Sequence, residues 1–463
     1  MEIPVEKNGK YIVEIIDYGA NGEGIAKING YTIFVIGALK GEKCKIHVMK
    51  ILSSHAFAKV TEIIEASPER TDSDCETYPR CGGCSLRHIN YNETLRIKKE
   101  NVKNLIKKSI PGEETKVEDT IGMEEPRYYR NKAIYPISQN KEIGIFAKLS
   151  HNIVPIKECK IQTIQSQAIA KYIARNWNGT IYNEKTQTGL LRNIMIREGF
   201  DSKEIMVVLV QNGTENLRKD KINPKILNIE KMIEEFPNIK IVVVNINTKN
   251  TNVVLSNKNI TIYGNGYIED KLNEYTFKIS PNSFYQVNPT QTKKIYNLAI
   301  EKAMLKENDI LCDLYCGIGT IGIFASKHVK KVYGIEIVPE AIENAKENAK
   351  VNNINNIEFI RGDVEITFTK LLNKDVKPNV VIVDPPRKGL DNETVENLCK
   401  LGLERLIYIS CNPSTLVRDL KQLKETYEIK SITPIDNFCY SSHVECVVAM
   451  SLKKNHETQL YCE

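Results

Sequence analysis

One cysteine in this sequence stands where it could do covalent chemistry. Residues Leu406 to Ser410 have the composition of a buried strand, and Cys411 follows directly, before Asn412 and Pro413. Proline lacks a backbone N–H and restricts the residue before it, so the strand should end there in a turn. Ligands of open α/β sheets bind at such strand ends, where a thiolate would be a strong nucleophile. Taken alone, the pattern also fits a small buried side chain, the commoner role of a free cysteine.

A glycine-rich motif lies upstream of this cysteine. Asp309 to Tyr315 reads as a buried strand, and the glycines that follow have the spacing G-x-G-x-x-G at Gly317, Gly319 and Gly322. The next predicted strand, Val332 to Glu336, ends in a carboxylate at about the distance expected for a ribose-hydroxyl acceptor. Glycines allow the backbone to approach a nucleotide closely, so the motif predicts an adenosine cofactor. By itself it does not separate NAD from S-adenosylmethionine.

Three acidic residues favour S-adenosylmethionine. Glu336, Asp363 and Asp384 each follow one of three consecutive predicted strands, and a helix is expected from Pro339 to Asn352. NAD requires a second mononucleotide-binding half, and only about 140 residues follow Gly322. A nicotinamide oxidoreductase would also leave the cysteine unexplained.

The residues after Asp384 indicate which atom is methylated. Asp384-Pro385-Pro386 resembles the Asn/Asp-Pro-Pro-aromatic motif of amino methyltransferases, but its fourth position holds Arg387 instead of an aromatic residue. A methyl donor beside a cysteine therefore favours carbon methylation. Addition of a thiolate to carbon 6 of a pyrimidine makes carbon 5 nucleophilic enough to attack the methyl group.

That reaction also needs a base to remove the carbon-5 proton. Glu445 precedes the last apolar strand, Cys446 to Ser451, and partial burial would raise its pKa into a useful range. Considered in isolation, Glu445 could equally be a solvated residue at a strand entry. His443 is better explained as a structural hydrogen-bonding residue.

A second group of cysteines lies near the N-terminus. Cys75, Cys81 and Cys84 are closely spaced, with two glycines between the last two. Iron–sulfur clusters and structural zinc both use such thiolates, and His88 would complete a zinc site of the Cys₃His type. Disulfides are not expected, because no signal peptide is recognisable and the remaining cysteines are scattered through predicted strands and helices.

The first 65 residues predict a small β-domain. Asn29-Gly30 between two strands is a strong hairpin signal. Five short strands favour a barrel of the oligonucleotide-binding type, although an interaction module without any role in nucleic-acid binding is an alternative. The expected strands are Tyr11 to Asp17, Gly24 to Ile28, Tyr31 to Ile36, Lys43 to Ile51 and Ala56 to Ile64.

Composition is compatible with these interpretations. The chain has 463 residues, 41% of them hydrophobic, and a formal net charge of +6, which suits RNA without demonstrating RNA binding. No apolar stretch reaches the length that spans a membrane. We expect a cytoplasmic, monomeric protein without membrane association, and RNA is a partner that this charge permits.

At this point the sequence resembles the RNA uracil-5-methyltransferases over essentially its whole length. The resemblance rests on five motifs that stand in the order of the family: Ser283–Asn288, Asp313–Gly319, Asp384–Arg387, Ser410–Pro413 and His443–Glu445. One departure is the segment Phe438-Cys439-Tyr440-Ser441, where the family usually has Phe-Pro-x-Thr. The N-terminal strands resemble a TRAM domain, with Lys40 at a turn position that commonly holds proline.

The resemblance implies roles for individual residues. Cys411 would be the nucleophile and Glu445 the base, and S-adenosylmethionine would bind Gln286, Tyr315, Thr320, Glu336, Asp363 and Asp384. Cys159 occupies the family position of a fourth metal ligand beside Cys75, Cys81 and Cys84. Members with this cysteine spacing carry a 4Fe-4S cluster, which we favour over zinc, and mostly modify large-subunit ribosomal RNA. Methylation of transfer RNA is the alternative, and a non-catalytic RNA-binding cluster protein would explain only the N-terminal half.

The expected fold is multidomain α/β. We predict an OB-like β-barrel (TRAM) over residues 1–66 and a central α+β domain with the cysteine cluster over 67–90 and 127–260. A linking helical segment over 91–126 is expected to pack on the catalytic domain. Residues 261–463 are predicted to form a C-terminal Rossmann-like class I methyltransferase domain. In the central domain, Tyr129–Lys132 is expected either to contact RNA or the cluster, or to be a structural turn.

Overall fold

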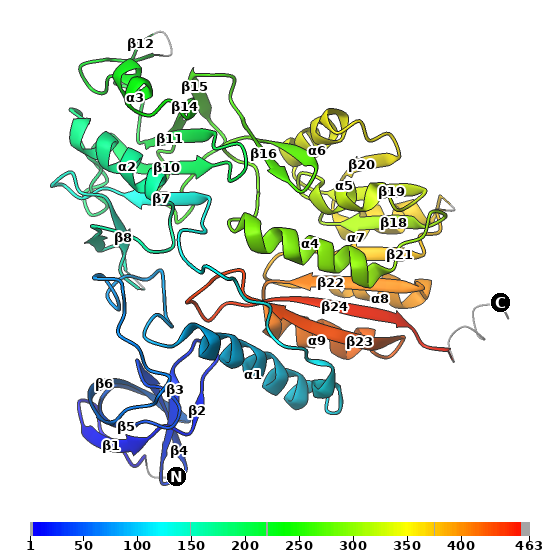
Figure 1. The fold of residues 1–463 in the computed structure, drawn as a ribbon, viewed down its shortest axis with the longest axis horizontal. Helices are drawn as coiled ribbons and strands as arrows, with labels where there is room; N and C mark the ends of the chain where they lie inside the picture. Colours follow the sequence, from blue (N-terminus) through cyan, green and yellow to red (C-terminus); the bar gives the residue numbers. More distant parts are fainter. Residues whose placement is uncertain (1–2, 149, 219–220, 375, 455–463) are drawn as a thin grey trace.

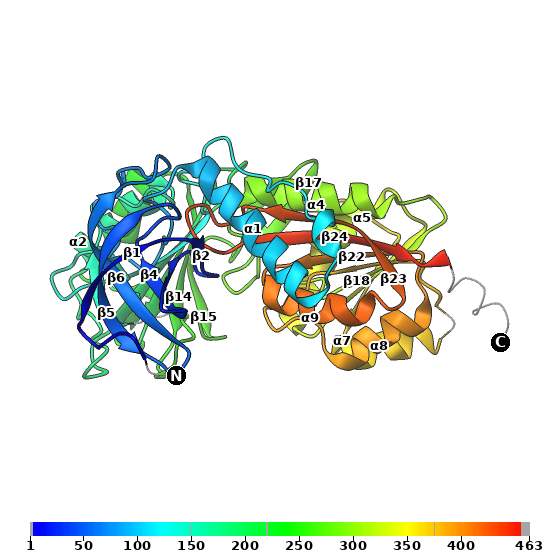
Figure 2. The ribbon, with the colours of Figure 1, turned by 90° about the horizontal axis from the view of Figure 1, so that it is seen from below.

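The computed structural model describes residues 3–148, 150–218, 221–374 and 376–454. The expected outer domain ends, residues 1 and 463, lie outside these ranges. Three sheet-centred regions are visible, with the N-terminal sheet at lower left, the central sheet at upper left and the large C-terminal sheet at right (Figure 1). Helix α1 (Tyr91–Ser109) bridges the N-terminal and C-terminal regions (Figure 2).

The N-terminal region is a curled six-stranded sheet in the order β1-β5-β6-β4-β3-β2. The Asn29–Gly30 hairpin is confirmed, with both residues at positive φ between β3 and β4. The first expected strand is divided: β1 pairs with β5, whereas β2 pairs with β3, so the chain passes from one sheet edge to the other. The strands are β1 (Lys10–Glu14), β2 (Asp17–Tyr18), β3 (Gly24–Ile28), β4 (Tyr31–Ile36), β5 (Lys43–Ile51) and β6 (His55–Glu65).

Helix α1 belongs structurally with the C-terminal sheet. Its buried stripe includes Ile97, Val102 and Ile106, and the helix packs on α9 (Pro413–Leu423) and β23 (Tyr427–Ile435). After α1 and the 3₁₀ helix Glu113–Lys116, the chain forms isolated bridges to β23 at Val117 and Ile121. Residues 91–121 therefore cover one edge of the C-terminal sheet.

The central region is built on a five-stranded sheet in the order β15-β14-β11-β10-β7, with β11 and β14 parallel. Because β15 is the last strand of this sheet, we propose that the central domain extends to Tyr263, slightly past the expected boundary. The elements are β7 (Lys132–Pro136), β8 (Gly144–Phe146), β9 (Ile153–Pro155), α2 (Ile164–Asn176), β10 (Leu191–Glu198), β11 (Ile205–Gln211), β12 (Leu217–Arg218), β13 (Lys221–Ile222), α3 (Ile229–Glu235), β14 (Ile239–Ile246) and β15 (Asn259–Tyr263).

The C-terminal region has a seven-stranded sheet in the order β20-β19-β18-β21-β22-β24-β23. Strands β18 to β22 are parallel, and β24 runs antiparallel to both of its neighbours. The strands are β18 (Ile310–Leu314), β19 (Lys331–Glu336), β20 (Ile357–Arg361), β21 (Val380–Val383), β22 (Arg405–Ser410), β23 and β24 (Glu445–Leu452). A hairpin of β16 (Ile268–Leu272) and β17 (Tyr275–Ile279) precedes them.

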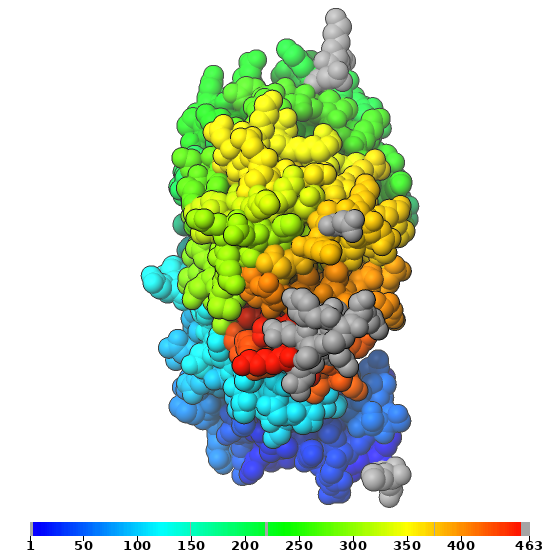
Figure 3. Space-filling view, turned by 90° about the vertical axis from the view of Figure 1, so that its right-hand side faces the viewer, coloured from blue at the N-terminus to red at the C-terminus, as the bar shows by residue number. Residues whose placement is uncertain are grey.

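Helices cover both faces of this sheet. Helices α4 (Pro289–Ala303), α5 (Thr320–Ser326) and α6 (Pro339–Val351) lie on one face, and α7 (Val364–Leu372), α8 (Asn392–Leu401), α9 and α1 lie on the other. Seen from the right-hand side of Figure 1, the surface has red and orange C-terminal residues between yellow and green residues above and cyan and blue N-terminal residues below (Figure 3). Within the described residues, no helix is long and apolar enough to span a membrane.

Candidate active site and cysteine site

Strand pairing brings Cys411 and Glu445 together. The antiparallel ladder of β22 and β24 pairs Ser410 with Cys446, so the next pair in register is Cys411 and Glu445. Pro413 then begins α9, capped by the Asn412 side chain, which accepts a hydrogen bond from the Ser414 N–H at 3.2 Å. Residues 34 positions apart in the chain thus meet at one end of the sheet.

Burial perturbs the protonation of both groups. Glu445 is 3% exposed, and burial raises its pKa to about 7, which suits a general base near neutral pH. Burial, aided by the charges of Glu445 and Asp384, raises the pKa of the Cys411 thiol to about 11. Burial, together with Glu445, also raises the pKa of Asp384 well above its usual range. The site therefore holds protons that could be exchanged among three neighbouring groups.

A buried amide that the sequence did not reveal lies between two of the expected site residues. Asn437 is fully buried, and its Nδ2 lies 3.5 Å from Glu445 Oε1 and 3.5 Å from Gln286 Oε1. Its Oδ1 has no hydrogen-bond partner among the described residues. Asn437 directly precedes the segment Phe438–Ser441 that departs from the family pattern, and none of the five motifs includes it.

The loop after Asp384 is attached to the cysteine turn. Asn412 Nδ2 donates to the Arg387 carbonyl at 3.0 Å, and Thr415 Oγ1 donates to the same oxygen at 3.2 Å. Arg387 is exposed, and its charge opposes the rise in pKa of both Cys411 and Glu445. The sequence motif therefore places a cation at the mouth of the site, in the position where an amino methyltransferase has an aromatic ring.

The expected cofactor residues line the carboxyl ends of successive strands. Glu336 ends β19, and its carboxylate accepts from the Gly317 N–H at 3.2 Å and the Val338 N–H at 2.9 Å. Gly319 has φ +82°, and a Cβ there would lie 2.6 Å from the Phe359 ring, so glycine is required. The absence of a side chain at this position lets the turn pack closely against Phe359.

The other cofactor candidates surround this turn. Tyr315 has φ +66° and donates to Asp391 Oδ2 at 3.3 Å, and Thr320 begins α5. Asp363 caps α7, accepting from the Glu365 N–H at 3.1 Å. The buried Asp313 was not expected as a site residue: burial raises its pKa to about 7, and Oδ2 accepts from the Gly322 N–H at 2.8 Å.

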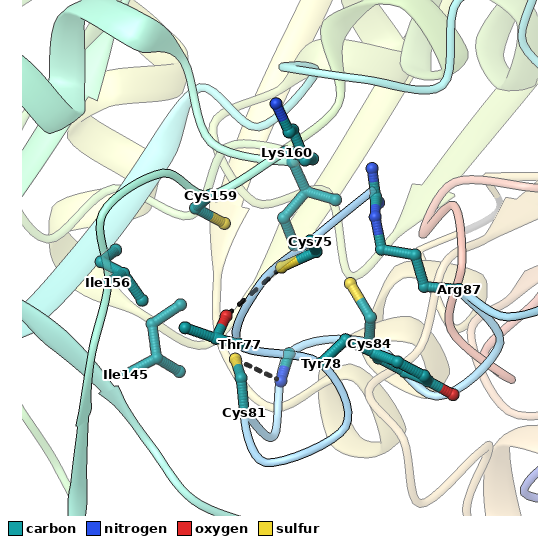
Figure 4. A pocket seen from close by; sticks show the side chains of 12 residues that line it. Cys75, Thr77, Tyr78, Cys81, Cys84, Arg87, Ile145, Ile156, Cys159 and Lys160 are labelled. Carbon is teal, nitrogen blue, oxygen red and sulfur yellow. Dashed lines mark hydrogen bonds between the residues drawn. The ribbon is translucent and has the colours of Figure 1, made fainter. Parts of the chain in front are cut away.

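The four candidate metal ligands line one cavity, although Cys159 is distant in sequence. Figure 4 shows the thiols of Cys75, Cys81, Cys84 and Cys159 around a common space between the loop 75–84 and the segment that follows β9. Burial raises the pKa of the Cys84 thiol to about 12, and the neighbouring thiols add to this effect. Such a set of thiols matches the donors of an iron–sulfur cluster or zinc.

His88 does not complete this set. Its Nδ1 lies 2.5 Å from Tyr78 Oη, and His88 is not among the residues that line the cavity. Among the described residues, no three ligating side chains stand at the spacing of a bound metal ion. The four thiols therefore line one cavity but are not arranged to coordinate a single metal ion.

The cysteine segment contacts the loop that leads to Glu445. The Tyr440 carbonyl accepts hydrogen bonds from the N–H groups of Ser85 and Leu86, both at 2.9 Å. The Arg87 guanidinium lies 4.4 Å from the centre of the Tyr440 ring. The two sites are thus joined through Tyr440.

Comparisons with known proteins agree with this arrangement. The family model described as tRNA (Uracil-5-)-methyltransferase matches residues 90–454, and the TRAM domain model matches residues 5–61. A Clostridium acetobutylicum protein described as an uncharacterized RNA methyltransferase is 43% identical, with 96% of this chain and 98% of that protein covered. A Staphylococcus aureus protein with the same description is 39% identical, with 97% and 99% covered.

A solved structure shares the fold. It is that of a Pyrococcus abyssi tRNA (uracil-54, C5)-methyltransferase in complex with S-adenosyl-L-homocysteine, which is 25% identical and has a TM-score of 0.74, with 95% of this chain and 99% of that chain covered. The C-terminal region therefore has a methyltransferase fold. The chain belongs to the RNA uracil-5-methyltransferase family and carries an N-terminal TRAM domain. It is an RNA methyltransferase that uses S-adenosylmethionine.

Proposed function

We propose that this enzyme methylates carbon 5 of a uridine in large-subunit ribosomal RNA through a covalent adduct between Cys411 and carbon 6 of the uracil. The observation that carries the proposal is the placement of Cys411 and Glu445 next to the paired Ser410 and Cys446, with Asp384 close enough to raise the pKa of Cys411 and Glu445 close enough to raise the pKa of Asp384. A nucleophile beside a base of raised pKa is the combination that this reaction requires.

Each step has a group to perform it. The Cys411 thiol proton can pass to Asp384, which leaves Glu445 deprotonated for the last step, and the sulfur then bonds to carbon 6 while the ring electrons move onto oxygen 4. When bound, S-adenosylmethionine supplies the methyl group, and carbon 5 forms the new bond as the sulfur–methyl bond of the donor breaks. Glu445 then takes the carbon-5 proton, the carbon 5–carbon 6 double bond re-forms and the Cys411 thiolate leaves.

We assign the cofactor to the strand ends that the family motif marks. Glu336 would accept hydrogen bonds from the ribose hydroxyls, and Asp363 would accept one from the adenine amino group. Tyr315 and Thr320 would line the same groove, and Gln286 and Asp384 would face both the methyl donor and the uracil. The amide of Asn437 beside Gln286 and Glu445 supports a shared site for base and cofactor.

We propose a 4Fe-4S cluster at Cys75, Cys81, Cys84 and Cys159. The four cysteines line one cavity, and His88 is turned to Tyr78, so the donors facing this space are thiols, as in an iron–sulfur cluster. The proposed reaction is polar and needs no electron from the cluster, so its role would be structural.

The choice of RNA rests on the cysteine site. Family members with this cysteine spacing mostly modify ribosomal RNA, which favours that substrate. The Pyrococcus structure is of a transfer-RNA enzyme, so transfer RNA is the second candidate. Either RNA would place the enzyme in the cytoplasm, and we expect it to act as a monomer.

Transfer of labelled methyl groups tests this function. The purified enzyme is incubated with labelled S-adenosylmethionine and unmodified transcripts of ribosomal or transfer RNA, with NADH added in parallel. Ribosomal transcripts containing 5-fluorouracil should give a complex that survives denaturation, since the adduct has no carbon-5 proton to lose. The Cys411→Ala variant should form none. A complex of undiminished yield with that variant would eliminate Cys411 as the nucleophile, and labelling of transfer RNA alone would overturn the assignment to ribosomal RNA.

A further inference from the structure

Two half-buried cations in the central domain have no counter-charge. Arg130 forms an isolated bridge with Gln162, and Lys132 is the first residue of β7. The two are near enough for the charge of Arg130 to lower the pKa of Lys132. Within the described ranges, neither side chain forms an ion pair within 4.0 Å or a hydrogen bond. Other buried cations have partners of two kinds: Lys98 and Arg405 pair with carboxylates, and Arg192 donates to carbonyl oxygens.

A third cation lies behind them. Arg197 on β10 is the register partner of Lys132 and is 1% exposed. Among the residues that the structure describes, its guanidinium donates only to carbonyl oxygens, to Ser280 at 3.2 Å and Ser283 at 2.9 Å. Burial and the charges of Arg197 and Arg130 lower the pKa of Lys132 to about 7, and no carboxylate opposes this effect. Lys132 therefore loses its proton more readily than an exposed lysine does, and a bound anion would favour its protonated form.

These cations lie beside the candidate active site. Between Arg130 and Lys132, Asn131 donates from its backbone N–H to the Val287 carbonyl at 2.9 Å and from Nδ2 to the Gln286 carbonyl at 3.0 Å. The charges of Arg130 and Arg387 both help to lower the pKa of His443, two residues before Glu445. The site thus has these positively charged side chains, Arg130 and Lys132 with Arg197 behind them, next to the residues proposed to hold the uracil.

Unpaired cations that are partly removed from water are costly unless an anion neutralises them. We propose that Arg130 and Lys132, with Arg197 behind them, form a binding site for a backbone phosphate of the substrate RNA, next to the nucleotide whose base enters the site. This inference rests on the proposed function, because it requires an RNA substrate. A uridine extruded from its stack turns about its own backbone, so a fixed phosphate would define where the base arrives.

The carboxylate of S-adenosylmethionine is the competing anion, since Gln286 is also proposed to face the methyl donor. The strand-end groove through Glu336 is formed by the C-terminal sheet alone, whereas Arg130 and Lys132 belong to the central region. A ligand held by both regions must span them, as a polynucleotide does. We therefore assign the site to phosphate.

The salt dependence of RNA binding tests this assignment. Affinity of the full-length enzyme for an unmodified large-subunit ribosomal RNA transcript is measured from low to moderate salt, for wild type and Lys132→Met. Loss of one phosphate contact should weaken binding roughly tenfold and reduce the slope of log K against log salt by roughly 0.7 to 1. The control Lys240→Met removes an exposed lysine from β14 of the same sheet and should leave the slope unchanged.

A second measurement locates the phosphate. In an oligonucleotide centred on the mapped uridine, one methylphosphonate replaces each flanking phosphate in turn. At one of these positions, the methylphosphonate should weaken binding of the oligonucleotide to the wild-type enzyme but not to Lys132→Met. An unchanged slope for Lys132→Met, or a loss confined to S-adenosylmethionine affinity, would overturn the phosphate site. Absence of RNA methylation by wild type would instead refute the proposed function, so the two failures are distinguishable.

Discussion

Replacing Glu445 by glutamine should stabilise the protein while trapping it on its substrate. The carboxyl group is buried, and its pKa rises from 4.5 to about 7 on folding. A group with a raised pKa binds its proton more tightly in the folded state, so its contribution to stability is lost as pH rises from about 4.5 through 7. Glutamine has nearly the same shape and does not ionise.

The expected magnitude follows from the pKa shift. At about 1.36 kcal/mol per pKa unit, ionisation of Glu445 costs roughly 1 kcal/mol of folding free energy at pH 5 and about 3 kcal/mol at pH 8. Relief of this cost should raise the Tm of Glu445→Gln above that of wild type. The difference should grow by roughly 5–10 °C between pH 5 and pH 8.

Thermal unfolding monitored at several pH values measures this divergence. Glu301→Gln is a suitable control, because Glu301 is exposed on α4. The Tm of this variant should change with pH in parallel with that of wild type. In the same preparations, ordinary RNA should accumulate as a methylated covalent complex with Glu445→Gln, because the carbon-5 proton cannot be removed. If the Tm of Glu445→Gln changes with pH in parallel with that of wild type, the burial argument is refuted. If Glu445→Gln turns over RNA at the wild-type rate, the base is another group.

Two further outcomes are expected. Cys75→Ser should lose iron and the brown colour of anaerobically purified protein. Its affinity for RNA should fall more than its affinity for S-adenosylmethionine. A colourless wild-type protein containing zinc would contradict the cluster. Lys98→Met should cost roughly 3–5 kcal/mol, because it leaves the fully buried Asp436 with a charge that Lys98 no longer neutralises. Denaturant unfolding measures this loss. The double variant Lys98→Met with Asp436→Leu should recover most of the lost free energy of unfolding. A double variant no more stable than Lys98→Met would show that the loss does not come from the unpaired Asp436 charge.

The order of strands and the local turns were readable from the chain. Apolar runs of five to seven residues predicted β18, β19 and β22 close to their observed limits. Asn29–Gly30 predicted its hairpin, and Pro413 predicted the end of the strand that carries Cys411. These features depend on backbone restrictions and side-chain types within a few residues, and such information is local.

Pairing between distant segments was not readable from periodicity. The sequence did not show that β24 would lie antiparallel beside β22, the arrangement that places Glu445 opposite Cys411. It did not show that the first strand would divide between two sheet edges, or that β15 would complete the central sheet. Resemblance to a family supplied Glu445 and Cys159, which the local pattern alone would have left as a solvated acid and an ordinary cysteine.

By itself, the sequence determined which side chains could react and where each strand ended, because nucleophilicity and backbone restrictions are properties of residues and their neighbours. Only the tertiary structure decided which groups share an environment. Asn437 lies between Gln286 and Glu445, and Lys132 lies opposite Arg197, because strands and loops far apart in the chain pack together. Burial and neighbouring charges, which raise the pKa of Glu445 and lower that of Lys132, exist only once that packing has removed water.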